Sequence, residues 1–138
     1  MTPLAFADRL ALSDLAARLG LWLDEQRFDE TADLFVPDTT VQTPGGAAHG
    51  VQALAEQARR NHAGFRTQHV ITDVLADVDG DRAHLRANLT VTFAKPGADG
   101  ALPVPVRTLG ERYDLDAVRT GHGWRLSRVE VRPVWASS

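Results

Sequence analysis

The sequence has no cysteine among its 138 residues, which excludes disulfides, thiolate metal sites and cysteine nucleophiles. Long hydrophobic runs are also absent, and no segment approaches the roughly 20 apolar residues that span a bilayer as a helix. The opening MTPLAFADRLALSD has no basic segment and carries Asp8 and Arg9 inside its apolar part. It therefore predicts the start of a helix rather than a secretion signal. We expect a cytoplasmic protein that does not act at a membrane.

An excess of positive charge is also absent. The formal net charge is −3, with basic and acidic residues interspersed. A nucleic-acid binder usually shows a basic face or stripe, so nucleic acid is not an expected partner. The chain has no glycine-rich phosphate loop, no cofactor motif and no pair of histidines at a spacing that favours a metal. We expect no cofactor and no metal, and the length predicts a single domain over residues 1–138.

Helical periodicity dominates the first part of the chain. Apolar residues at three- and four-residue steps predict an amphipathic helix of about 16 to 20 residues that ends near DEQR. A second, short helix is predicted over 29–35, because Asp29 is a good N-cap residue and Pro37 stops the helix soon after. A third helix is predicted over 51–62, where apolar residues and arginines occupy different faces. The apolar positions of the first helix are Leu12, Leu15, Ala16, Leu19, Trp22 and Leu23.

From Phe65 onward the periodicity changes to that of strands. The segment 70–78 has apolar residues on both faces, and 83–93 alternates cleanly between apolar and polar residues. DVDGDR between them predicts a tight hairpin, and two more strands are predicted over 106–120 and 124–135. TTVQT predicts one short strand between helices, PGGAAHG a turn, and KPGADGALPVP a loop without regular pairing.

This order predicts an α+β fold with three N-terminal helices packed on a strongly curved antiparallel sheet. A sheet of that shape leaves a cone-shaped central cavity between itself and the helices. Such a hollow is the usual place for a small-molecule site, so the expected partner is a small hydrophobic organic ligand.

Four stretches carry a likeness to a known family: LGLWLDEQRFDETADLF, GGAAHGVQALAE, FRTQHVITDVLADVDGDRAHL and GERYDLDAVRTGHGWRLSRVEVRPVW. In this order they resemble the SnoaL-like branch of the nuclear-transport-factor-2-like (NTF2-like, cystatin-like α+β cone) superfamily. The likeness covers nearly the whole chain. It implies the cone fold, which hosts isomerases, dehydratases, cyclases, epoxide hydrolases and non-catalytic subunits.

The nearest catalytic pattern resembles that of scytalone dehydratase and the bile-acid dehydratases. The resemblance implies catalytic roles for Asp24, at the end of the first helix, and His69, at the start of the strand after the third helix. It also implies that Arg132 binds a substrate oxygen. The chain departs from the pattern where leucines stand at the tyrosine positions, and no imidazole occurs near 108–110. Thr43 at the ketosteroid-isomerase base position argues against that mechanism.

An imidazole and a carboxylate in hydrogen-bond contact form a proton-transfer unit, because the carboxylate fixes the tautomer and the other ring nitrogen faces the substrate. General acid–base help of this kind is worth about 10²- to 10⁴-fold. That suffices for elimination of water, an enol–keto shift or an aldol-type ring closure. We expect the pair to lie in a substrate-binding hollow lined by Leu19, Leu23, Phe35 and Trp135.

Two interpretations stay open. The first is a cofactor-independent dehydratase, isomerase or cyclase that acts on a hydrophobic cyclic or polyketide-like compound through Asp24 and His69. The second is a non-catalytic cone domain, either a ligand-binding protein or an accessory subunit like the β-subunits of ring-hydroxylating dioxygenases. In that case His69 is a satisfied polar contact between helix and sheet.

The remaining histidines, His49, His62, His84 and His122, are each interpreted as solvent-facing or capping residues. In particular, His62 is placed on the solvated face of its helix beside Arg59. The polar residues of 83–93, Arg86, Asn88, Thr90 and Thr92, suit a flat, wet contact, so we expect a homodimer through the outer face of the sheet.

Overall fold

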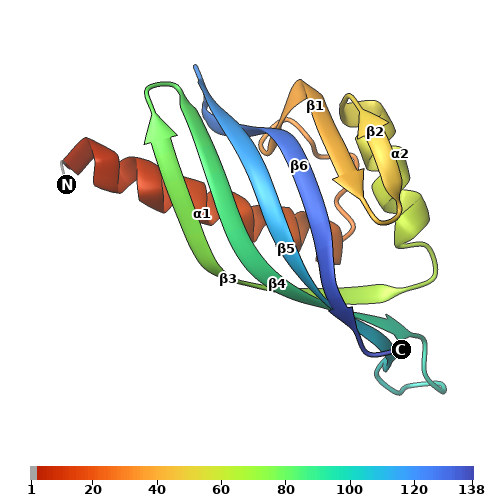
Figure 1. Cartoon of the computed structure of the whole chain (residues 1–138). Helices are drawn as coiled ribbons and strands as arrows, with labels where there is room; N and C mark the ends of the chain where they lie inside the picture. Colours follow the sequence, from red (N-terminus) through yellow and green to blue (C-terminus); the bar gives the residue numbers. More distant parts are fainter. Residues whose placement is uncertain (1–2) are drawn as a thin grey trace.

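The computed structural model describes residues 3–138 as two helices and six strands. Figure 1 shows the helices on one side of the sheet, with the opposite face of the strands left open. The N-terminal helix packs on strands β3 and β6, and the second helix packs on β1 and β2. The elements in chain order are α1 (Pro3–Asp24), β1 (Phe35–Thr43), β2 (Gly46–His49), α2 (Val51–Asn61), β3 (Arg66–Asp79), β4 (Arg82–Lys95), β5 (Val104–Thr120) and β6 (Gly123–Ala136).

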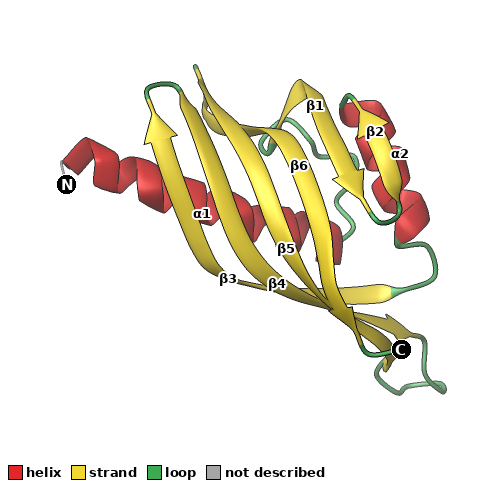
Figure 2. Cartoon of the chain, viewed as in Figure 1, coloured by secondary structure: helices red, strands yellow, loops and turns green. Residues whose placement is uncertain are grey.

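All six strands belong to one sheet, in the order β2-β1-β6-β5-β4-β3 (Figure 2). Strand β1 runs parallel to β6, and every other neighbouring pair is antiparallel. The sheet is therefore mixed rather than antiparallel, and it is not strongly curled. The prediction of an α+β fold is confirmed, and the prediction of a strongly curved antiparallel sheet was wrong.

The prediction of a helix over 29–35 was wrong. Residues 27–34 form turns, in which the carbonyl oxygen of Thr31 accepts hydrogen bonds from the backbone N–H groups of Leu34 and Phe35. Phe35 then begins β1, whose first residue is paired with Leu126 of β6. The extended backbone that Pro37 imposes on the residue before it fits a strand here, and tertiary pairing overrides the local helix signal.

Two further boundaries differ from expectation. Residues 46–49, expected as part of a turn, form β2 and pair with the end of β1. Pairing in β5 also begins earlier than expected, because Val104 and Pro105 already lie opposite Lys95 and Ala94. Both segments join the sheet through pairing with a neighbouring strand, which local composition does not reveal.

A bulge in β3 changes which residues of the strand face inward. The register against β4 shifts between Thr72 and Leu75, and Asp73 there has a φ of 58°. Aspartate tolerates this left-handed conformation better than most residues. Before the bulge His69 and Ile71 face inward, and after it the inward positions are Val74 and Ala76.

The core lies between the two helices and the inner face of the sheet. Its buried side chains include Leu12 and Leu15 of α1, Leu85 of β4, Leu115 of β5 and Leu126 of β6. Within residues 3–138, neither helix is long and apolar enough to cross a membrane.

Candidate functional site

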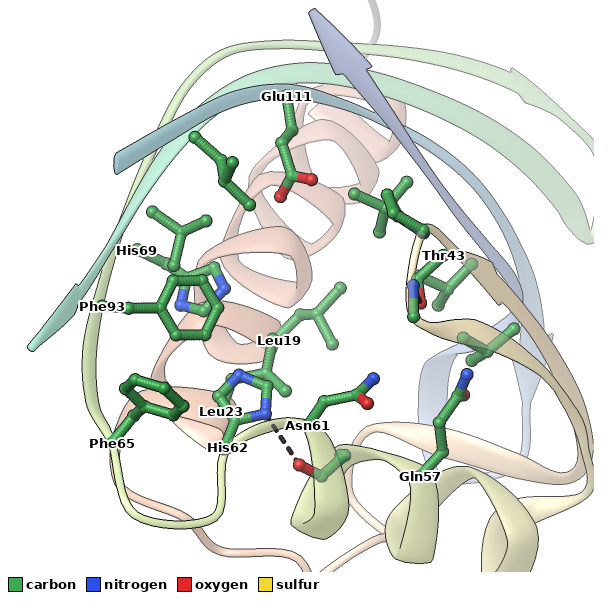
Figure 3. Close-up of a pocket in the computed structure, with 18 of the residues that line it drawn as sticks. Leu19, Leu23, Thr43, Gln57, Asn61, His62, Phe65, His69, Phe93 and Glu111 are labelled. Atoms are coloured by element: carbon green, nitrogen blue, oxygen red, sulfur yellow. Dashed lines mark hydrogen bonds between the residues drawn. The ribbon is translucent and has the colours of Figure 1, made fainter. Parts of the chain in front are cut away.

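A cavity of about 620 Å³ lies between α1, α2 and the inner face of the sheet. This volume is in the range of small-molecule sites, roughly 300 to 1,000 Å³. Most of its wall is apolar, as a hydrophobic ligand requires. The polar side chains labelled around it in Figure 3 are Thr43, Gln57, Asn61, His62, His69 and Glu111.

Asp24 and His69, far apart in the sequence, are hydrogen-bonded at the edge of this cavity. The His69 Nδ1 atom lies 2.6 Å from Asp24 Oδ1. The same carboxylate accepts a bond from the Thr67 hydroxyl (2.9 Å) and, through Oδ2, from the backbone N–H of His69 (2.8 Å). The side chains of His69 and Asp24 are only 6% and 16% exposed. Asp24 thus ends α1 directly over the first residues of β3 and fixes the imidazole there.

A glycine in α1 allows this close approach. Gly20 lies one helical turn before Asp24, and a Cβ atom at this position would come 2.8 Å from Ile71 Cδ1 and 3.4 Å from His69 Cβ. The missing side chain lets α1 pack against β3 where Asp24 has to reach His69. Gly20 therefore helps to set the geometry of the pair.

Burial alone would raise the pKa of Asp24, but the hydrogen bonds from His69 and Thr67 outweigh it and hold the pKa below its ordinary value. Asp24 is therefore a carboxylate at neutral pH and can only accept hydrogen bonds. In the neutral imidazole the proton accordingly sits on Nδ1, which leaves Nε2 as an acceptor on the cavity side. His69 itself lines the cavity, so this nitrogen is available to a ligand.

Glu111 of β5 was not foreseen. It is 8% exposed and lines the cavity, and no described residue forms a hydrogen bond or ion pair with its carboxyl group. Burial raises the pKa of Glu111, although the charges of His69 and Arg107 partly oppose this. The sequence does hold a signal, since Glu111 occupies an inward position of the alternation Leu109, Glu111, Tyr113, Leu115.

Tyr113, two residues further along β5, also lines the cavity and is almost completely buried. Burial raises the pKa of its phenol well above the ordinary value, so the hydroxyl keeps its proton. In the dehydratase pattern that the sequence resembles, a tyrosine is expected on the first helix. This chain has its single tyrosine on β5 instead, on the inner face of the sheet beside Glu111.

His62 was expected on a solvated face and is in fact buried. Its Nδ1 lies 2.7 Å from the carbonyl oxygen of Ala58, and its ring packs against those of Phe28, Phe93 and His69. Burial lowers the pKa of His62, outweighing the backbone hydrogen bond that would raise it. The prediction failed because His62, directly after the end of α2, follows the buried Ala58 by four residues and so lies on the inward side of the helix, next to His69 of β3.

The structure brings some of the other expected residues together and leaves others outside. Leu19, Leu23 and Phe35 line the cavity. Arg132 does not: its side chain is 64% exposed and pairs with Glu130 on the same strand. Trp135 is also outside the lining and half exposed, and its indole packs on Gly110.

His84, as expected, lies on the polar face of its strand, where its Nε2 is 2.9 Å from Asp114 Oδ1. Among residues 3–138, no group of three or more histidine, aspartate or glutamate side chains is arranged to hold a metal ion. The titratable side chains that line the cavity are His62, His69, Lys95, Arg107, Glu111 and Tyr113.

Comparison with known proteins agrees with this fold. An uncharacterised protein of Mycobacterium tuberculosis (strain H37Rv) is 28% identical over 130 residues, which are 91% of this chain and 86% of the relative. A protein of Novosphingobium aromaticivorans, provisionally named a scytalone dehydratase, has a similar structure with a TM-score of 0.83 and 22% identity, over 99% of this chain and 91% of its own.

Two other solved structures have the same fold. An NTF2-like protein with a cystatin-like fold, also from Novosphingobium aromaticivorans, gives a TM-score of 0.74 at 24% identity over 94% of this chain and 84% of its own. A type 2 hexachlorocyclohexane dehydrochlorinase gives a TM-score of 0.80 at 16% identity, over 96% of this chain and 89% of its own. The family of SnoaL-like domains matches residues 5–130. This match covers most of the chain, which therefore belongs to the SnoaL-like domain family and has the NTF2-like fold.

Proposed function

We propose that this protein is a cofactor-independent lyase that eliminates water from a hydrophobic cyclic compound, with His69 as the base. The observation that carries the proposal is the hydrogen bond of 2.6 Å between His69 Nδ1 and Asp24 Oδ1 at the wall of an apolar cavity. It leaves the Nε2 lone pair of His69 directed to the ligand space, as a general base requires. Among proteins of similar structure, one is provisionally named a scytalone dehydratase and another is a dehydrochlorinase, so elimination chemistry occurs on this fold.

In the proposed reaction, His69 Nε2 removes a proton from a carbon next to an activating group, and Asp24 stabilises the imidazolium that forms. The electron pair of the C–H bond becomes the new double bond, and the bond from the neighbouring carbon to its hydroxyl breaks. A hydroxyl is a poor leaving group and needs a proton as it departs. Water leaves, and the proton on His69 returns to the acid through solvent.

Glu111 is the proposed proton donor. Its raised pKa means that it holds a proton at higher pH than an ordinary glutamate does, and its carboxyl group reaches the same cavity from β5 (Figure 3). Tyr113 beside it keeps its proton and can donate a hydrogen bond to a substrate oxygen. Two groups with pKa values pushed in different directions by their surroundings, Asp24 downward and Glu111 upward, are a typical arrangement for acid–base work.

The experiment is a panel of cyclic β-hydroxy ketones, followed by the ultraviolet absorbance of the conjugated product. The wild type is compared with His69→Gln and Asp24→Asn, and with His84→Gln as a matched control at a histidine on the outer face of the sheet. We expect His69→Gln to lower kcat/KM by about 10²- to 10⁴-fold while the control stays at the wild-type value. Equal turnover by all four proteins would refute the mechanism. Tight binding without turnover by the wild type would favour a ligand-binding domain.

A further inference from the structure

The inward face of α2 carries polar residues where an amphipathic helix normally carries apolar ones. Positions 54, 57, 58 and 61 of α2, and position 62 directly after it, follow the three- and four-residue spacing of one helical face. Leu54 and Ala58 are the apolar members, and Gln57, Asn61 and His62 are the polar ones; all five line the cavity. Figure 3 shows the three polar side chains directed into the same hollow.

His62 can only accept a hydrogen bond from a ligand. The Ala58 carbonyl, 2.7 Å from Nδ1, is an acceptor, so the proton of the neutral ring must be on Nδ1. The pKa of His62 is lowered by burial, which favours this neutral form. Its Nε2 has no donor among the described residues, and the ring neighbours on that side are aromatic. A donor on the ligand would satisfy it.

Gln57 is a second cavity-lining group without a hydrogen-bond partner. The residue is 4% exposed, and no described residue forms a hydrogen bond with its amide. Gly46, the first residue of β2, leaves room for this amide, because a Cβ atom at Gly46 would come within 3.1 Å of Gln57 Nε2. An oxygen on the ligand would satisfy this amide too.

We propose that the polar face of α2 is a recognition subsite in which His62 accepts a hydrogen bond from a ligand hydroxyl and Gln57 binds a second ligand oxygen. The preferred ligand is then a hydroxylated ring compound with at least one O–H group on the α2 side, and not a halogenated hydrocarbon of the same size. The rings of His62 and His69 are 6.2 Å apart between centroids, so this hydroxyl lies close to the carbon from which His69 would remove a proton. Only that last point rests on the proposed function.

A site that hydrogen-bonds a hydroxyl rejects an analogue that lacks it, because the protein group is then left buried and unpaired. The test uses two probes of similar size, 1-naphthol and 1-fluoronaphthalene, at pH 7. Affinity is measured by titration calorimetry on the full chain. We expect the wild type to bind 1-naphthol about 5- to 100-fold more tightly than 1-fluoronaphthalene, the range that loss of one buried hydrogen bond gives.

The variant is His62→Phe, which keeps a ring among Phe28 and Phe93, and the matched control is His122→Phe in the exposed β5–β6 turn. His62→Phe should bring the affinity for 1-naphthol down to that for 1-fluoronaphthalene, with the control unchanged. Gln57→Leu should remove the additional affinity of 1,5-dihydroxynaphthalene over 1-naphthol. Thermal unfolding of each variant confirms that it is folded.

A wild type with equal affinity for the two probes, or a naphthol preference that survives in folded His62→Phe, would overturn the subsite. No binding of any probe to the wild type would count against both the subsite and the proposed function. A preference that is lost in His62→Phe, in a protein that turns over no substrate, would support the subsite and leave the lyase proposal refuted. The two proposals can therefore fail separately.

Discussion

Replacing Asp24 by asparagine tests how the His69 imidazole is held. The carboxylate accepts three hydrogen bonds: 2.6 Å from the His69 ring, 2.8 Å from the His69 backbone and 2.9 Å from Thr67. An asparagine side chain has one acceptor oxygen and one NH₂ group. If the oxygen keeps the bonds from the ring and from Thr67, the NH₂ group faces the backbone N–H of His69, donor against donor.

The expected loss of stability follows from these contacts. One charge-assisted bond is lost, worth about 1.5 to 3 kcal/mol, and the other two become neutral and weaker. We expect the free energy of unfolding to fall by about 2 to 4 kcal/mol at pH 7, measured by urea denaturation. The control is Asp14→Asn on the same helix, because Asp14 pairs with Arg18 at the surface with both side chains largely exposed. That change should stay within about 0.5 kcal/mol.

The pH dependence gives a second check. The folded pKa of Asp24 is below its ordinary value of 3.8, so the unfolded chain takes up the proton first as pH falls. The stabilisation by Asp24 is then fully present above about pH 5 and is lost as pH falls through 3.8 toward the folded pKa. The difference between wild type and Asp24→Asn should shrink over that range. An Asp24→Asn variant as stable as the wild type at pH 7, or a difference independent of pH down to 2, would refute the reasoning.

Glu111→Gln should raise the free energy of unfolding by about 1 to 3 kcal/mol at pH 8 and by little at pH 4. The pKa of Glu111 is raised in the folded protein, so the stability of the wild type falls as pH rises above the ordinary pKa of 4.5, and glutamine removes this loss. Urea denaturation at both pH values checks this. Gly20→Ala should not increase the free energy of unfolding by the roughly 1 kcal/mol expected from the higher helix propensity of alanine, because the added Cβ would crowd Ile71. An increase of that full size would argue against the close packing of α1 on β3. Arg132→Ala should leave the free energy of unfolding and the affinity for the naphthol probes unchanged, because the side chain is exposed and outside the cavity; urea denaturation and calorimetry check this. We also propose a homodimer through the outer face of the sheet, where Thr90 and its neighbours lie, and light scattering that gives a monomer mass at micromolar concentration would contradict it.

Periodicity was sufficient for the long elements. The apolar spacing of α1, the alternation in β4 and the turn at Gly80 each depend on nearby residues, and the structure confirms them. The prediction of a short helix over 29–35 failed because the end of this segment pairs with β6, 91 to 92 residues further along the chain. The backbone N–H of Leu126 donates to the Leu34 carbonyl oxygen, and Phe35 is paired with Leu126. A parallel pairing of that range leaves no local signal.

The site was predictable only in part. The contact between Asp24 and His69 was expected from the resemblance, and the structure joins them by a hydrogen bond, with His69 in the cavity lining and Asp24 outside it. Glu111 left a readable signal, a carboxylate at an inward strand position, and this was overlooked. His62 also left a signal, since it follows Ala58 by four residues and so continues the inward face of α2, and this spacing was overlooked.

The central claim is that His69 acts as a base inside the cavity, and hydrogen–deuterium exchange into a ketone tests it most directly. The ketone is 2-tetralone, a bicyclic compound with acidic C–H bonds and no leaving group, followed by NMR in D₂O. The account predicts that the wild type and His84→Gln accelerate exchange over buffer and that His69→Gln loses at least about 100-fold of this rate. Exchange by His69→Gln at the wild-type rate, or none by a wild type that binds the ketone, would contradict it.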